Sequence, residues 1–236
     1  MAGDNDHPNQ IRIVNIQSHA IASLGPGNSR MNLDNPDFVS IAPNGSIYFV
    51  SLDGDVHRFA AGAEGDVLPL STRHLKPLFH GSDLLINHLV ADNLGNLYLS
   101  RADRDAIETI SLSGETRTLE GAHTGLAGPN GMTVDSRGNL YVTNTRNNSV
   151  TVYSLGAHGN ARPFRVIAGD KTGLQQPQAI ANDRNGTLYI FYGPPERNSS
   201  TYPEQYVAAF ALNANGNEAP LRRSLVRAGC FTNDHI

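Results

Sequence analysis

The sequence predicts an all-β fold, a β-propeller of four-stranded antiparallel blades, and three observations carry this prediction. A unit of short alternating strands recurs along the 236 residues, and its clearest copy lies at residues 125–153. In each copy a glycine closes the turn between the first two strands, and these glycines are Gly45, Gly95, Gly138 and Gly186. Their spacings of 50, 43 and 48 residues lie in the range of four-stranded blades. A second marker, A-x-G-[N/D]-x-x-P, recurs at residues 63–69, 157–163 and 214–220.

The clearest copy contains four strands in succession. Residues 131–135 are a short apolar run that ends in a turn. Residues 139–143 and 149–153 alternate polar and apolar side chains, as half-buried strands do, and residues 144–148 form a polar loop between them. Residues 164–167 supply the fourth strand. One such meander cannot bury both of its faces, so we expect successive blades to pack on one another around an axis.

The turn between the first two strands has its own chemistry. A tight turn at the repeat glycine requires a positive φ, which glycine adopts without steric cost. Three of the four glycines have an aspartate three residues earlier, namely Asp92, Asp135 and Asp183. An aspartate at this place accepts hydrogen bonds from the turn backbone, so we expect these carboxylates to be structural.

The chain divides into a polar start and one predicted domain. Residues 1–10 are expected to be disordered, and a single propeller domain is expected over residues 11–236. Residues 11–16 and 20–25 match the third and fourth strands of the clearest copy, so they predict an N-terminal half blade. Four full repeats follow, at about residues 35–79, 80–121, 122–170 and 171–229. No C-terminal partner for the half blade is visible. Either the ring closes imperfectly or the chain is part of a longer one, and the second reading is favoured.

Composition excludes several classes of protein. The net charge is −4 and Lys and Arg are not clustered, which argues against nucleic-acid binding. No apolar run is long enough to span a membrane, and no signal peptide is visible, so the compartment stays open. Cys230 is the only cysteine, so no internal disulfide is possible. The sequence has no nucleophile elbow, phosphate loop or HExxH motif, and a non-enzymatic role is favoured.

A set of polar residues marks a candidate site. Eight residues before each repeat glycine stands a polar side chain ahead of an apolar strand, and these residues are Asp37, Asn87, Asn130 and Gln178. In a propeller these positions converge at the mouth of the central channel, on the face that carries the loops between second and third strands. Asn144 begins one of these loops and completes the predicted ligand-binding set. The expected rim comprises residues 53–55, 101–104, 144–148 and the long link 193–204.

Residues 129–150, with the sequence PNGMTVDSRGNLYVTNTRNNSV, resemble the NHL repeat. Weaker copies lie at residues 177–190, 36–50 and 86–99. The resemblance covers most of the chain at the level of blades and implies a propeller that binds a protein or a small molecule, without naming the ligand. It also extends to the gluconolactonase and senescence-marker family, six-bladed metal-dependent lactonases with acidic and amide ligands at the channel mouth.

That second resemblance implies an alternative function. Asn130 lies in a P-N-G motif like that of a lactonase metal ligand, and Asp37 would stand for that family's N-terminal glutamate. Gln178, however, occupies the place of a second carboxylate, which would also perform acid–base chemistry. A Ca²⁺ ion takes six to eight oxygens with several carboxylates among them, whereas this ring offers one. We therefore expect a binding module without a cofactor, and keep a Ca²⁺- or Zn²⁺-dependent lactonase-type hydrolase as the alternative.

Overall fold

The computed structural model describes residues 11–14, 21–24, 36–51, 55–64, 67–74, 86–193 and 205–226. These residues form short strands joined by turns, with a single 3₁₀ turn, η2, at Asp170–Thr172. Within this described part no helix is long and apolar enough to cross a membrane. The predicted all-β fold is confirmed. The expected disorder of residues 1–10 and the loop at 194–204 lie outside the described residues.

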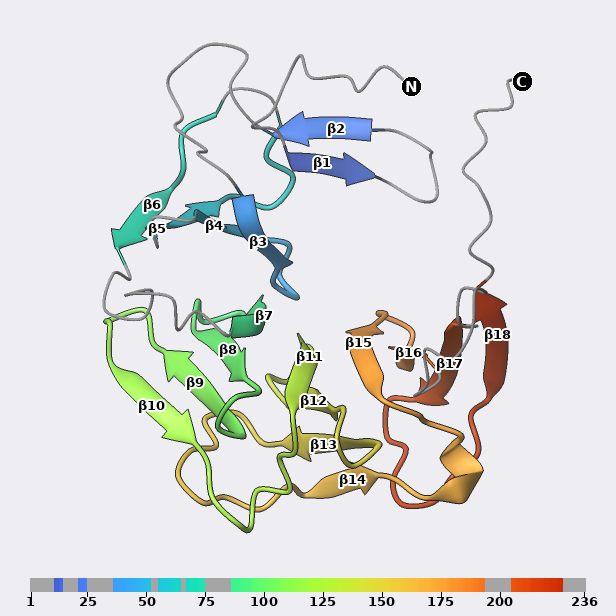
Figure 1. Cartoon of the computed structure of the whole chain (residues 1–236). Helices are drawn as coiled ribbons and strands as arrows, with labels where there is room; N and C mark the ends of the chain where they lie inside the picture. Colours follow the sequence, from blue (N-terminus) through green and yellow to red (C-terminus); the bar gives the residue numbers. More distant parts are fainter. Residues whose placement is uncertain are drawn as a thin grey trace, which may run out of the picture. The chain divides into compact units, whose positions relative to one another are not determined.

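Four sheets each contain four consecutive strands in simple meander order (Figure 1). The first sheet is β3 (Pro36–Ile41), β4 (Ile47–Ser51), β5 (Asp55–Phe59) and β6 (Ser71–His74). The second is β7 (Ile86–Ala91), β8 (Leu97–Arg101), β9 (Ala106–Ile110) and β10 (Thr116–Leu119). The third is β11 (Pro129–Val134), β12 (Leu140–Asn144), β13 (Ser149–Tyr153) and β14 (Arg165–Ile167). The fourth is β15 (Pro177–Asn182), β16 (Thr187–Tyr192), β17 (Gln205–Ala211) and β18 (Arg222–Val226).

Ahead of these sheets, β1 (Ile11–Val14) and β2 (Ile21–Leu24) form an antiparallel pair. The predicted four blades and N-terminal half blade are thus confirmed as sheets. The chain forms two compact units, one of Met1–Leu84 with Leu89–Leu97 and the other of Leu85–His88 with Tyr98–Ile236. The second unit contains the third and fourth blades whole.

The turn between the first two strands of each blade has the expected geometry. The repeat glycines have φ values of 85°, 84°, 84° and 83° in chain order. Asp135 Oδ1 accepts hydrogen bonds from the backbone N–H groups of Arg137 at 2.9 Å and Asn139 at 2.8 Å. Asp92 and Asp183 make the same contacts in their own turns. The structural role predicted for these aspartates is confirmed.

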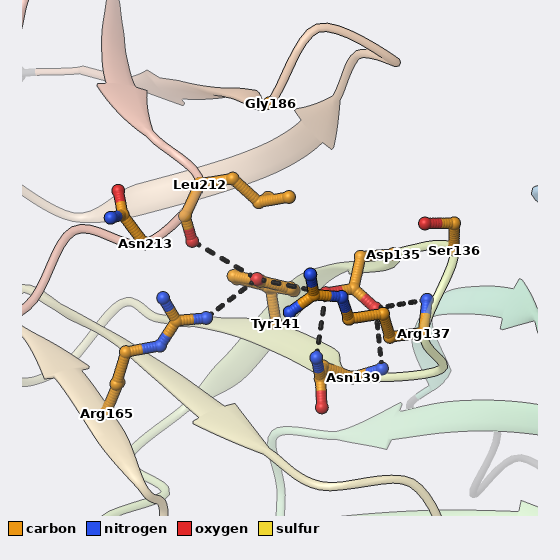
Figure 2. Close-up of a pocket in the computed structure, with 9 residues that line it drawn as sticks. All are labelled: Asp135, Ser136, Arg137, Asn139, Tyr141, Arg165, Gly186, Leu212 and Asn213. Atoms are coloured by element: carbon orange, nitrogen blue, oxygen red, sulfur yellow. Dashed lines mark hydrogen bonds between the residues drawn. The ribbon is translucent and has the colours of Figure 1, made fainter.

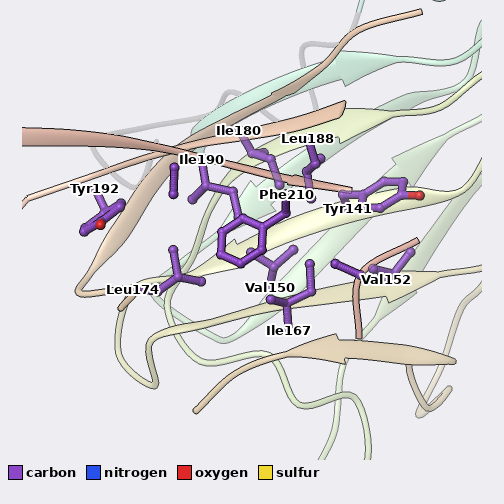
Figure 3. Close-up of a cluster of buried hydrophobic side chains, with 12 residues drawn as sticks. Tyr141, Val150, Val152, Ile167, Leu174, Ile180, Leu188, Ile190, Tyr192 and Phe210 are labelled. Atoms are coloured by element: carbon purple, nitrogen blue, oxygen red, sulfur yellow. The ribbon is translucent and has the colours of Figure 1, made fainter. Parts of the chain in front are cut away.

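An apolar cluster lies between the third and fourth blades (Figure 3). The third blade contributes Tyr141, Val150, Val152 and Ile167, and the fourth contributes Ile180, Leu188, Ile190 and Phe210. Every position of β12 and β13 is buried, including the polar ones. The expectation that these two strands are half-buried is therefore wrong. Their alternation is real, but a blade that is covered on both faces buries both sets of side chains.

Two copies of the second sequence marker, at residues 157–163 and 214–220, join their blade to the one before it. Gly159 forms a parallel bridge with Leu119, in the last strand of the second blade. Asn160 Oδ1 accepts a hydrogen bond of 2.8 Å from His123 N–H. One blade later the same contacts are made by Gly216 with Ile167 and by Asn217 with Lys171. These two copies recur because each satisfies backbone groups at the outer edge of the preceding sheet.

Candidate functional site

The predicted ring residues occupy equivalent places in their blades. Asn87, Asn130 and Gln178 are each the second residue of a first strand, in β7, β11 and β15. In β11 and β15 the pairing register shifts at this residue, as it does around Asp37 in β3. Such a bulge bends the strand and redirects a side chain. Asp37 belongs to the first unit, and its side chain lies outside the part that the structure describes.

Two hydroxyl groups bring the three amide residues of the second unit next to one another. Ser100 Oγ lies 2.8 Å from the carbonyl oxygen of Asn130 and 3.3 Å from that of His88, which follows Asn87. One blade later, Thr143 Oγ1 lies 3.1 Å from the carbonyl oxygen of Gly131 and 3.5 Å from that of Gln178. A hydroxyl group of the second strand thus links β7 to β11 and, one blade later, β11 to β15. These links place Asn87, Asn130 and Gln178 in succession.

The side-chain amides of these three residues are uncommitted, which means that they make no hydrogen bond within the described part of the chain. Asn87 and Gln178 are exposed, and Asn130 is half-buried. Among the described residues, their amides make no hydrogen bond, although the backbone carbonyl groups of Asn130 and Gln178 are engaged. An amide presents one acceptor and two donors. We call the face of the second unit that carries the β12–β13 loop and the starts of β7, β11 and β15 the mouth face. It offers three unused amides in successive blades, the line of amides.

A pocket of about 590 Å³ lies on the same face, and it is lined by Thr145, Arg146, Asn148, Gln175 and Gln176. Its two walls are the β12–β13 loop and the segment ahead of β15. Asn148 Oδ1 accepts a hydrogen bond of 2.7 Å from Gln176 N–H and ties the walls together. The pocket lies two residues from Gln178, so it extends the line of amides.

Residues with strained backbone conformations lie on this face. Within the described ranges, the non-glycine residues with positive φ are Asp105 at 53°, Asn148 at 54° and Gln176 at 45°. Asp105 and Asn148 each precede the third strand of a blade, and each accepts a backbone N–H just before the next first strand. Left-handed conformations of this kind cost about 1–3 kcal/mol each and concentrate at functional sites.

Charged groups on this face are paired. Arg101 contacts Asp103 at 3.3 Å and Glu108 at 3.4 Å, and Arg104 also pairs with Glu108. The hydrogen bond from Arg101 lowers the pKa of Asp103, so that carboxylate stays ionised. Arg146 in turn pairs with Asp105. A ligand that docks on this face would therefore meet amide groups and ion pairs whose charges already neutralise each other.

Asn144, the fifth residue of the predicted ligand set, is placed differently. Its side chain is fully buried. Asn144 Oδ1 accepts a hydrogen bond of 3.1 Å from Ala127 N–H. Nδ2 lies 3.3 Å from Ser149 Oγ and 3.0 Å from Thr151 Oγ1. The structure thus gives Asn144 a positioning role, in which it holds the β12–β13 loop and is not presented to solvent.

Replacing Asn144 with alanine is expected to lower the free energy of unfolding by about 2–4 kcal/mol. The change leaves Ala127 N–H without its acceptor and removes the amide partner of the buried Thr151 hydroxyl, whereas Ser149 keeps its hydrogen bond to Asn147. Each orphaned polar group costs about 1–3 kcal/mol. Urea denaturation measures the loss. The matched substitution Asn130→Ala removes an uncommitted amide and should change stability by no more than about 0.5 kcal/mol. Equal stabilities for the two variants would contradict the assignment.

The metal alternative gains no further ligands from the described part of the chain. No group of three or more His, Cys, Asp or Glu side chains gathers there. Burial lowers the pKa of His88, next to Asn87, and its Nδ1 atom is buried without a hydrogen-bond partner among those residues. The pairing of Asp37 with Asn130 as metal ligands stays a prediction.

The sequence missed several residues of this face. Ser100 and Thr143 each stand five residues after a repeat glycine, and this recurrence is the signal that could have found them. Gln175 and Gln176 carry no such signal, because their place in the pocket depends on the approach of two blades. Comparison between copies of the repeat finds conserved contacts, whereas pocket residues follow only from the packed structure.

One family model and several solved structures are similar to this chain. The family model of the NHL repeat matches residues 126–153. A search of curated proteins gave no significant match. Among solved structures, a streptogramin B lyase is 14% identical, with 89% of this chain and 65% of that chain covered and a TM-score of 0.46. A virginiamycin B lyase from Staphylococcus aureus is 16% identical, with 89% and 67% covered and a TM-score of 0.46.

A chain of a nidogen/laminin complex is 22% identical, with 87% of this chain and 73% of that chain covered and a TM-score of 0.49. The present chain spans 65% of the streptogramin B lyase, slightly less than two thirds of its length. Kinship with the gluconolactonases stays a prediction. The NHL match falls within the third blade, whose meander order the other three four-stranded sheets share. Residues 126–153 therefore match the NHL repeat, within a fold of four four-stranded blades of the β-propeller type.

Proposed function

We propose that the protein is a binding module whose ligand, a protein segment or a small molecule, docks on the mouth face of the second unit. The observation that carries this proposal is the line of uncommitted amides at Asn87, Asn130 and Gln178. The amide of Asn144, by contrast, is engaged in four contacts within the fold. Side chains that the fold does not use are available for recognition.

The chemistry of the face favours an uncharged polar ligand. Its arginines already have carboxylate partners, so a charged ligand would have to displace an existing ion pair. The adjoining pocket is lined by Thr, Arg, Asn and Gln side chains, and none of its lining residues is an apolar one. Affinity must therefore come from several hydrogen bonds, each contributing about 0.5–1.5 kcal/mol.

The test is a binding screen with a paired control. Labelled protein is applied to an array of uncharged 15-residue peptides and an array of neutral oligosaccharides, and each hit is measured by calorimetry. The double variant Asn130→Ala, Gln178→Ala is expected to weaken binding about tenfold or more, since two hydrogen bonds of the size above are lost. Its thermal unfolding should match that of the wild type.

The control variant is Asn185→Ala, which removes an exposed amide from the first turn of the fourth blade, at the other end of the strands. It should bind every hit as the wild type does. If the double variant also binds as the wild type does, the ligand uses another surface and the proposal is wrong.

A further inference from the structure

A cleft of about 390 Å³ opens between the third and fourth blades at the end of the strands that carries the repeat glycines (Figure 2). It lies at the opposite end of β12 from the mouth face, because successive turns of a meander alternate between the two ends. Its walls are the β11–β12 turn, Arg165 of β14, Gly186 and the residues that follow β17. The cleft is independent of the proposed function.

Arg165 is a half-buried cation in this cleft. Its guanidinium lies 5.8 Å from the ring centre of Tyr141 and 5.1 Å from that of Phe164. Nη2 donates a hydrogen bond of 2.9 Å to the Tyr141 hydroxyl. Among the described residues no carboxylate forms an ion pair with Arg165. Charged groups that lose part of their hydration are usually paired, so this guanidinium lacks an expected partner.

The one carboxylate of the cleft is already saturated. Asp135 is 4% exposed, and Oδ1 accepts the two backbone N–H groups of its own turn. Oδ2 lies 2.8 Å from Asn139 Nδ2 and 3.3 Å from the Tyr141 hydroxyl. Asp135 therefore closes the turn and leaves no oxygen free for an arginine.

A second guanidinium lines the same opening. Arg137 follows Asp135 in the turn and is exposed, and within the described residues it forms no ion pair. Figure 2 shows Arg137 beside the Asp135–Asn139 turn, with Arg165 and Asn213 on the other wall. The cleft thus holds two unpaired cations against one carboxylate that is fully engaged.

We propose that this cleft binds a small organic carboxylate between Arg165 and Arg137. Guanidinium groups match the planar carboxylate in two parallel hydrogen bonds, and the volume suits a small organic molecule. A phosphate also accepts paired hydrogen bonds from a guanidinium, but many phosphate sites add backbone N–H groups. In this turn those N–H groups are occupied by Asp135.

The test is calorimetric titration of the full chain with citrate, a tricarboxylate, at low ionic strength. Inorganic phosphate and sodium chloride at matched ionic strength are titrated in parallel. Citrate is expected to bind saturably and to raise the melting temperature, since a ligand that binds only the folded state stabilises it. Arg165→Gln and Arg137→Gln should each weaken citrate binding about tenfold or more, as hydrogen bonds to charged groups are worth about 1.5–3 kcal/mol.

The matched control is Arg162→Gln, an exposed arginine outside the cleft, which should leave citrate binding unchanged. Arg137 is exposed, so its variant keeps the test decisive even if Arg165→Gln fails to fold. Absence of saturable citrate binding would overturn the proposal. So would equal weakening by all three variants, or phosphate binding as tight as citrate binding.

Discussion

Replacing Phe210 with alanine is expected to lower the free energy of unfolding by about 3–5 kcal/mol, the usual cost of truncating a buried phenylalanine. Phe210 is 1% exposed and lies in the apolar cluster between the third and fourth blades (Figure 3). It pairs with Leu188 on the adjacent strand and packs in the cluster that includes Val150 and Ile167 of the preceding blade. Urea denaturation monitored by circular dichroism measures the loss, with equal m-values required for the comparison.

Phe164→Ala is the matched control for this prediction, because it is the same chemical change at a side chain that is 49% exposed. Its ring contacts the Arg165 guanidinium, which contributes at most about 1 kcal/mol at an exposed site. The two variants should therefore differ by about 2 kcal/mol or more. If they lose equal stability, the third and fourth blades do not share the core that Figure 3 shows.

Turn chemistry was predictable because it is local. A glycine at positive φ and an aspartate three residues before it determine the first turn of a blade without help from the rest of the chain. Gly138 and Asp135 behave as their neighbours in sequence predict, with a φ of 84° and two backbone hydrogen bonds. Recurrence of this turn then predicts the blades, since each copy starts another meander.

Burial was not predictable from the same pattern. Thr143, Ser149 and Thr151 look like solvent-facing positions of half-buried strands, and Asn144 looks like the start of a polar loop. All four are buried. They are satisfied by one another and by carbonyl groups of the neighbouring blade, as the contact of Thr143 with Gln178 shows. A sequence gives the polarity of a side chain, but its partner across a blade interface comes from packing between distant residues. For this reason Asn144 was expected at the ligand.

The places of the three amide residues in their blades were predictable from the repeat, whereas the other residues that line this face were not. Counting back from the repeat glycine finds Asn87, Asn130 and Gln178, because equivalent positions of a repeat occupy equivalent places in each blade. The cleft at Arg165 was not predictable in this way. Arg137 has no counterpart in the other turns, and Arg165 follows the second marker as Arg222 does in the next blade. The two arginines line one cleft only because a turn and a fourth strand lie at the same end of the blade.

Replacing Gly131 with alanine is expected to destabilise the protein by at least about 3 kcal/mol, at the upper end of the cost of overpacking. The φ of Gly131 is not positive, so alanine fits the local backbone and would by itself stabilise by about 0.4–1 kcal/mol. Whether the substitution stabilises or destabilises the protein is decided by the packing around Gly131. A Cβ atom there would lie 2.5 Å from the Gln178 carbonyl oxygen and 2.7 Å from Ala179 Cα.

Both of these contacts are with backbone, so no side chain can rotate away, and β11 and β15 must separate to admit the methyl group. Separation would also pull the Gln178 carbonyl from Thr143, which lies 3.5 Å away. Gly193→Ala is the matched control, since its nearest neighbour, Gln205 Cγ, is at 3.9 Å, an ordinary contact. Thermal and urea unfolding of the two variants make the comparison. Equal stability would mean that the first strands of these blades do not touch, and Asn130 and Gln178 would then have no shared site.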